Sequence, residues 1–336
     1  MVAAPTPEDI RRDARWLAQA FDPASGLVRL VEMDRAAYRA ASFLDDRLLQ
    51  APIVASVMPM TEVASAMLPD DRRDARWIFH IGHVGSTLIA RLLGELEAVL
   101  AVREPRLLRD LAGLSPDERA PLVPAVQALY SRTFAADQTA LVKTTSFVSE
   151  IAAELVPAGG RALMLTTSPE TYIATILAGE NSAKELPVLA ASRAARMTDR
   201  VPALTPVSGN LAQLAAAAWA CEASALEAAA ARIGDGALFL DFDRFLDDMT
   251  GSLRMLADFF GFAASDEALA AIVAGPLPTR YSKAMEYDYG PSLRAQLLHQ
   301  ARDEHRQTLP GALTMLHEAA GDAPLLAAAL GRSRSY

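Results

Sequence analysis

The sequence predicts an α/β protein with a doubly wound parallel sheet and helical N-terminal and C-terminal extensions. Between residues 77 and 262, short apolar or β-branched runs alternate with segments of helical periodicity. The predicted strands are Trp77–Ile81, Val99–Arg103, Ala140–Lys143, Ala162–Thr166 and Ala237–Phe242. Strands separated by helical segments require right-handed crossovers, which build a parallel sheet covered on both faces.

Helices are expected between these strands. Their predicted ranges are Ser86–Glu97, Pro116–Thr133, Phe147–Leu155, Pro169–Leu177, Asn210–Arg232 and Thr250–Phe260. The fifth of these is rich in alanine, but Gln213, Glu222 and Glu227 recur along it. This pattern favours a close-packed core helix over a membrane span.

Residues 1–74 predict a helical N-terminal extension. Thr6, Pro7 and Asp9 suit the cap and first turn of a helix that would run to about Ala20. Further helical patches are predicted at Arg35–Gln50 and Met60–Ala66. A polar connector, "PDDRRDAR", leads into the α/β core, for which we predict the bounds 75–262, and residues 263–336 predict a closing segment of helices and loops.

Composition narrows the class of protein. Hydrophobic residues make up 51% of the 336 residues and charged residues 22%, which is typical of a globular protein. A net charge of −9 and a pI near 5.2 argue against nucleic-acid binding, which depends on cationic contacts. Cys221 is the single cysteine, so an intramolecular disulfide and a cysteine-based zinc site are both excluded. The absence of a signal-like apolar start and of any long uncharged apolar run predicts a cytoplasmic protein with no membrane segment.

The stretch "WIFHIGHVGSTLIARLL", residues 77–93, predicts a buried strand, a glycine turn and the start of a helix. Gly82 and Gly85 can adopt backbone angles that let amides converge on an anion. Ser86 and Thr87 then open a helix whose unpaired N–H groups face the same point. The turn is suited to an anion, although a plain strand-turn-helix corner would also explain its glycines.

The P-loop pattern G-x-x-x-x-G-K-[ST] is not met, because His80 replaces its first glycine and Ser86 its lysine. Without that lysine, ordinary ATP chemistry is disfavoured. A kinase-like phosphotransferase remains an alternative, with Lys143 as a displaced lysine and Asp241 of "LFLDFD" holding magnesium. His80 and His83 could suggest zinc, but no third ligand is evident, and no metal site is predicted.

Several segments together resemble the sulfotransferase superfamily, whose P-loop-like fold holds 3′-phosphoadenosine 5′-phosphosulfate (PAPS). "HVGST", residues 83–87, is similar to the loop that binds the 5′-phosphosulfate, with His83 in the cationic position. "VREPRLL" supplies Glu104 after the second strand, and "ALVKTTSF" supplies Lys143. "RALMLTTSPETYIATIL" resembles the segment that binds the 3′-phosphate, with Thr167 in place of its arginine and Thr175 in place of its serine. "ALFLDFDRFLDDMTGSLRMLADFFGF" resembles a late strand and helix of the core.

The resemblance implies donor-binding residues, which are Gly82, His83, Val84, Gly85, Ser86, Thr87, Thr167, Thr175, Arg280 and Lys283. The last two belong to "TRYSKAMEYDYGPSLR", which resembles a C-terminal basic segment and whose tyrosines could stack on adenine. Arg193, Arg196 and Arg200 recur at helical spacing and could replace the missing arginine, or they form a solvated face.

The resemblance also implies catalytic roles for Glu104, Lys143 and His83. Glu104 is expected to be the base, because desolvation can raise a carboxylate pKa toward neutrality. Its structural alternative is an ion pair with Arg103 or Arg106. Lys143 is expected to be a second cation and to require an anion or carboxylate nearby. His83 would be charged beside a bound anion, or neutral if it only bonds the backbone.

The predicted function is a PAPS-dependent transferase that moves a sulfuryl group to a hydroxyl or amine acceptor. The alternatives are the kinase-like phosphotransferase and a non-catalytic nucleotide-binding protein of the same fold. The acceptor and the oligomeric state are not predicted.

Overall fold

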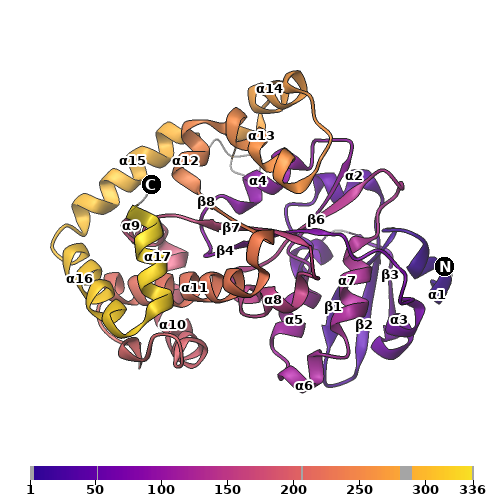
Figure 1. The fold of residues 1–336 in the computed structure, drawn as a ribbon, viewed down its shortest axis with the longest axis horizontal. Helices are drawn as coiled ribbons and strands as arrows, with labels where there is room; N and C mark the ends of the chain where they lie inside the picture. The colour runs from indigo at the N-terminus through magenta and orange to yellow at the C-terminus, as the bar shows by residue number, and fades with distance from the viewer. Residues whose placement is uncertain (1–3, 51, 206, 281–289, 335–336) are drawn as a thin grey trace.

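The computed structural model describes residues 4–50, 52–205, 207–280 and 290–334, and its centre is a five-stranded parallel sheet (Figure 1). The strands are β4 (Arg76–His80), β5 (Val99–Arg103), β6 (Thr139–Lys143), β7 (Arg161–Thr166) and β8 (Ala237–Asp241). All five predicted strands are confirmed, and each observed end lies within one residue of its predicted position.

The strand order is β5-β6-β4-β7-β8, and every neighbouring pair is parallel. The first strand of the core therefore lies in the middle of the sheet. Arg103, the last residue of β5, is in register with Lys143, the last residue of β6. Because parallel strands end at one edge, the segments that follow β4, β5 and β6 meet there.

Helices cover both faces of this sheet. Figure 1 shows α4 and α13 on one side of the strands and α8 and α11 on the other. The helices between α4 and α13 are α4 (Ser86–Leu93), α5 (Arg106–Ala112), α6 (Pro116–Arg119), α7 (Val123–Ser131), α8 (Ala152–Leu155), α9 (Pro169–Ala178), α10 (Glu180–Met197), α11 (Leu211–Ile233), α12 (Phe242–Asp247) and α13 (Met249–Phe260). Most of the alanines of α11 are buried, because this helix packs against the sheet on one side and against other helices around it. The expected close-packed core helix is confirmed.

The N-terminal extension is not simply helical, and this part of the prediction is wrong. Its helices are α1 (Pro7–Arg12), α2 (Arg35–Ala40) and α3 (Met60–Ala66), and between them lie three antiparallel strands in the order β1 (Trp16–Asp22), β2 (Leu27–Glu32) and β3 (Ala55–Pro59). The helix predicted to reach Ala20 ends at Arg12.

A tight turn at residues 22–26 reverses the chain, so that the segments before and after it can pair as strands. The Asp22 side chain accepts hydrogen bonds from Ser25 Oγ at 2.6 Å and from the backbone N–H of Ala24 at 3.1 Å. Gly26 closes the turn with φ +69°, an angle that favours glycine. Once the two segments are reversed onto each other, cross-strand pairing and burial against α5 outweigh their helical propensity.

The C-terminal extension is helical, as predicted. It contains α14 (Asp266–Ala274), α15 (Pro291–Glu304), α16 (Leu309–Ala319) and α17 (Pro324–Arg334). Arg302 of α15 pairs with Glu170 of α9 at 2.8 Å, so α15 lies along the helix that follows β7. None of the helices in the described ranges is both long and apolar enough to cross a membrane. The bounds proposed for the three regions stay predictions.

Candidate functional site

The loop between β4 and α4 has an unusual backbone. Gly82, His83 and Gly85 have φ angles of +84°, +54° and +65°, all in the left-handed region. A histidine there is uncommon, and the surrounding structure must stabilise it. Within the described residues, no side chain caps the N-terminus of α4, where Gly85 is the cap residue. The N–H groups of the first turn therefore face the loop, as an anion site requires.

Gly85 is required on steric grounds as well. A Cβ at this position would lie 2.0 Å from the ring of Phe242, the first residue of α12. The aromatic ring thus packs directly on the loop backbone. No side chain larger than hydrogen fits without displacing Phe242.

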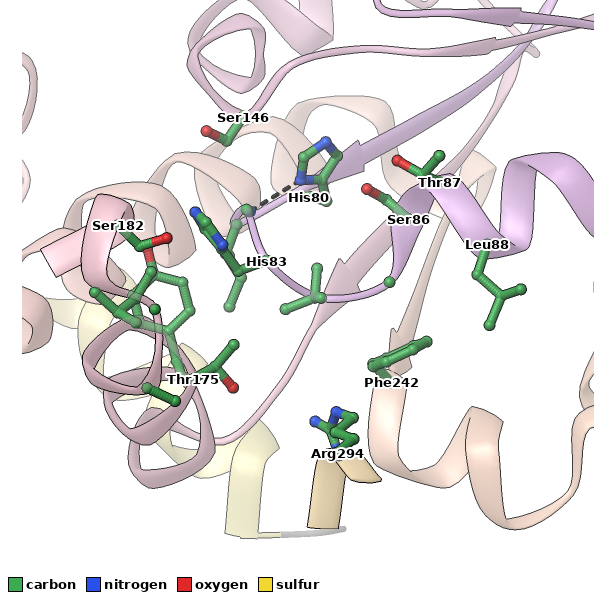
Figure 2. A pocket seen from close by; sticks show the side chains of 18 of the residues that line it. His80, His83, Ser86, Thr87, Leu88, Ser146, Thr175, Ser182, Phe242 and Arg294 are labelled. Atoms are coloured by element: carbon green, nitrogen blue, oxygen red, sulfur yellow. Dashed lines mark hydrogen bonds between the residues drawn. The ribbon is translucent and has the colours of Figure 1, made fainter. Parts of the chain in front are cut away.

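His80 holds the loop in place. Its Nδ1 accepts a hydrogen bond from the backbone N–H of Gly82 at 2.9 Å, and its Nε2 lies 2.9 Å from the carbonyl oxygen of Thr144 (Figure 2). Because Nδ1 accepts, Nε2 must carry the proton and donate to Thr144. His80, which stands where the P-loop pattern has its first glycine, therefore links the loop to the segment after β6. No cluster of three or more metal-ligating side chains exists among the described residues.

Glu104 and Lys143 form a buried ion pair at the sheet edge, between Glu104 Oε1 and Lys143 Nζ. The backbone N–H of Glu104 also donates to the carbonyl oxygen of Lys143 at 2.7 Å. Arg47 Nη2 contacts Glu104 Oε2 at 3.1 Å. Glu104 has a φ of +55°, so the backbone leaves the strand conformation at this residue. Its side chain lines the cavity. The expected carboxylate near Lys143 is confirmed.

The alternative partners proposed for Glu104 are wrong. The guanidinium of Arg103 donates to the carbonyl oxygens of Tyr38, Arg39 and Ala41. Arg106 pairs with two aspartates, Asp46 at 2.6 Å and Asp110 at 3.2 Å. Neither Arg103 nor Arg106 therefore pairs with the Glu104 carboxylate.

A cavity of about 710 Å³ opens beside the loop. It is bounded by the β4–α4 loop and by residues of α9, α10, α11, α12 and α15. The predicted site residues that line it are Gly82, His83, Val84, Gly85, Ser86, Thr87, Glu104, Lys143, Thr175 and Arg280. Residues from the ends of β4, β5 and β6, Thr175 of α9 and the distant Arg280 are therefore brought to one cavity.

One predicted donor contact, Thr167, lies elsewhere. Thr167 is buried, and its Oγ1 donates to Asp243 Oδ2 at 3.1 Å while its carbonyl oxygen accepts from Trp219 Nε1 at 3.0 Å. It lines a separate cavity of about 10 Å³ instead of the large one. Lys283 lies outside the described residues, as do Tyr281, Tyr287 and Tyr289.

The arginine row on α10 divides into two kinds. Arg196 pairs with Glu222 at 2.7 Å and with Glu150 at 3.2 Å, and Arg200 pairs with Glu150 at 2.8 Å. Burial alone would lower the pKa of Arg196, but the Glu222 carboxylate beside it raises that pKa above its ordinary value. Arg193 instead lines the cavity. The row is thus not a solvated face.

Sequence reasoning gave no separate role to Phe242 and Arg294, which both line the cavity. Arg294 of α15 pairs with Asp243 at 2.7 Å, and its guanidinium carbon lies 5.4 Å from the centre of the Phe242 ring. Figure 2 shows these two side chains on the Leu88 side of the loop, whereas His83 is directed toward Thr175 and Ser182. In the sequence, the feature that could have indicated Arg294 as a site residue was its positive charge within a basic C-terminal segment.

Asp241 serves a structural purpose. Its Oδ1 accepts from the backbone N–H groups of Asp243 at 2.8 Å and Arg244 at 3.2 Å, so it caps α12. Burial raises the pKa of its carboxyl above the ordinary value of 3.8. It is not among the residues that line the large cavity, which weakens the assignment of Asp241 to magnesium.

Comparisons with known proteins give the following matches. No protein-family model and no curated protein sequence matches the chain. The chain is similar in structure to the sulfotransferase domain of the curacin biosynthetic pathway, with a TM-score of 0.43 at 12% identity over 72% of this chain and 100% of that one. The sulfotransferase domain of the Synechococcus PCC 7002 olefin synthase matches at 0.42, with 16% identity over 70% and 90%. Mouse sulfotransferase SULT7A1, complexed with PAP, matches at 0.41, with 10% identity over 80% and 92%. All three of these solved structures are described as sulfotransferases or sulfotransferase domains.

Proposed function

We propose that this protein is a sulfotransferase that uses PAPS and an acceptor bearing a hydroxyl or amine. The observation that carries the proposal is the buried Glu104–Lys143 pair beside an amide-lined loop in one cavity. A carboxylate able to take a proton, a cation and an oxyanion seat are the groups that such a transfer needs.

The loop suits the phosphosulfate end of the donor. Gly82 and Gly85 supply left-handed backbone angles, and the uncapped first turn of α4 supplies N–H groups. Arg280 and Arg294 line the same cavity on other elements and would contact the donor's remaining charges. Phe242 and Leu88 give this part of the cavity an apolar surface suited to the adenine ring of the donor.

Glu104 and Lys143 would then act on the transfer itself. Glu104 takes the proton of the acceptor hydroxyl while the new O–S bond forms and the S–O bond to the phosphate breaks. Lys143 stabilises the charge that develops on the leaving phosphate oxygen. Their ion pair holds the two groups side by side at the sheet edge, where both reach the same cavity.

Thermal unfolding with different nucleotides tests the proposal. The protein is heated with adenosine 3′,5′-bisphosphate in the presence of a chelator, with ATP and Mg²⁺, and alone. Adenosine 3′,5′-bisphosphate at a hundredfold excess over its Kd should stabilise the fold by about 2.7 kcal/mol without metal. Stabilisation by ATP and Mg²⁺ alone would favour a phosphotransferase, and no response to either nucleotide would contradict nucleotide binding.

The assignment of the base is tested with Glu104→Gln. This variant should bind adenosine 3′,5′-bisphosphate like the wild type but lose about 10²- to 10⁴-fold in sulfuryl transfer, the usual contribution of a general base. Asp45→Asn is the matched control, because Asp45 binds the same Arg47 at 2.5 Å without lining the cavity. Full transfer activity in Glu104→Gln would remove Glu104 from the mechanism.

A further inference from the structure

One end of the cavity is lined by residues of α9, α10 and α11, and we call it the inner end. It is lined by Tyr172, Ser182, Glu185, Leu186, Leu189, Arg193 and Glu222. Figure 2 shows His83 directed toward Ser182, on the opposite side of the loop from Phe242 and Arg294. The inner end therefore continues from the loop in the direction away from the aromatic and basic groups assigned to the donor.

Arg193 is an unsatisfied cation at this end. Its neighbours Arg196 and Arg200 occupy both nearby carboxylates, Glu150 and Glu222. Arg193 forms no ion pair with any residue that the structure describes, and its Nε is buried without a hydrogen-bond partner there. Three guanidinium groups against two carboxylates leave one positive charge in excess.

Arg193 is half-buried, and leaving its buried Nε without a hydrogen bond is unfavourable, because buried polar atoms are nearly always hydrogen-bonded. An arginine fork fits a carboxylate with two parallel hydrogen bonds. Glu222 Oε2 is also buried and has no hydrogen-bond partner in the described ranges, so this end has an acceptor site open as well. Glu185 is exposed, and water screens its charge.

The surface between these polar groups and the loop is apolar. Ile176, Leu186, Leu298 and the buried ring of Tyr172 contribute to it. Burial raises the pKa of the Tyr172 hydroxyl well above its ordinary value, with Arg193 opposing that shift, so tyrosine stays neutral beside the guanidinium. A ligand that fills this space would have an apolar body and one anionic end.

We propose that the acceptor is a hydroxy-carboxylic acid whose carboxylate binds Arg193 and whose hydroxyl reaches Glu104. This assignment rests on the proposed function for the hydroxyl end, whereas the carboxylate contact can be measured by binding alone. Arg193 is a specificity-determining residue in this scheme, because it contacts the acceptor but not the atoms that react.

Binding measurements with paired probes test the proposal. The probes are 4-hydroxyphenylacetate and 8-hydroxyoctanoate, each beside its methyl ester, titrated into the full chain by calorimetry. Hydrogen bonds to charged groups contribute about 1.5–3 kcal/mol, so wild type should prefer an acid over its ester by about 10- to 100-fold. Arg193→Gln should reduce that ratio to about one, and Arg193→Lys should keep part of it.

Lys184→Gln is the matched control, because it removes an exposed positive charge from α10 at a residue that does not line the cavity. It should leave the acid-to-ester ratio unchanged. Circular dichroism of each variant establishes that the fold is retained, and Arg193→Lys serves if Arg193→Gln does not fold.

Three outcomes would overturn the assignment. The first is that wild type binds neither acid, and the second is an unchanged acid-to-ester ratio in Arg193→Gln. The third is that Arg193→Gln weakens adenosine 3′,5′-bisphosphate more than the acids, which would place Arg193 at the donor phosphate. Loss of bisphosphate binding in wild type itself would refute the proposed function, while the acid-to-ester ratio would still test Arg193.

Discussion

Replacing Gly85 by alanine should destabilise the protein through two separable effects. A left-handed φ of +65° costs a non-glycine residue about 1–2 kcal/mol. The new Cβ would also lie 2.0 Å from the Phe242 ring, and overpacking of this kind costs about 1–3 kcal/mol. Gly85→Ala should therefore lower the free energy of unfolding by about 2–5 kcal/mol, measured by urea denaturation.

Gly159→Ala isolates the backbone effect, because Gly159 has φ +74° but, apart from its two chain neighbours, no described residue has a heavy atom within 4 Å of the position that a Cβ would occupy. It should cost only about 1–2 kcal/mol. Phe242→Leu in the Gly85→Ala background should recover part of the difference, since it removes ring atoms from the clash. The steric reasoning would be refuted if Gly85→Ala cost no more than Gly159→Ala, or if Phe242→Leu added its full cost in the double variant.

Two further predictions concern the loop support and the cap of α12. His80→Phe should lower the free energy of unfolding by about 1–3 kcal/mol, because the buried carbonyl of Thr144 loses its donor. It should also weaken binding of adenosine 3′,5′-bisphosphate, because Gly82 loses the hydrogen bond that holds the loop. Unchanged stability and affinity would contradict a positioning role for His80. Because burial raises the Asp241 pKa above 3.8, the folded state binds the proton more readily than the unfolded chain, and the stability contributed by Asp241 is lost as pH rises through the folded pKa. Asp241→Asn still caps a helix, so it should be more stable than wild type at neutral pH, with the gap closing as denaturation is repeated toward pH 3.8; a gap independent of pH would count against this explanation.

The strands of the core could be predicted because each one is a buried apolar run bounded by helical segments. Burial on both faces of a parallel strand imposes that pattern on the sequence itself. The glycines of the loop were readable for a similar reason, since left-handed angles at Gly82 and Gly85 restrict the residue type directly. The N-terminal hairpin was missed because its turn, centred on Asp22 and Gly26, is a short local signal beside a strong helix cap at Thr6.

The partners of charged residues were harder to predict. Glu104 has an arginine immediately before it and another two residues later, yet its carboxylate binds Lys143 and Arg47. Arg103 is the last residue of β5, Glu104 leaves the strand with a φ of +55° and Arg106 opens α5, so proximity in sequence does not imply contact. The three arginines of α10 look equivalent by spacing, but the positions of Glu150 and Glu222 make Arg193 different from the other two.

The sequence by itself determined the parallel α/β core, the strand-turn-helix loop and the residue types available for binding an anion. These properties depend on periodicity and on backbone angles, which are local. The tertiary structure decided which charges meet, that His80 supports the loop, that Thr167 lies apart from the cavity and that Arg193 lines it. Those outcomes depend on strand order and helix packing, which bring together side chains that are distant in the sequence.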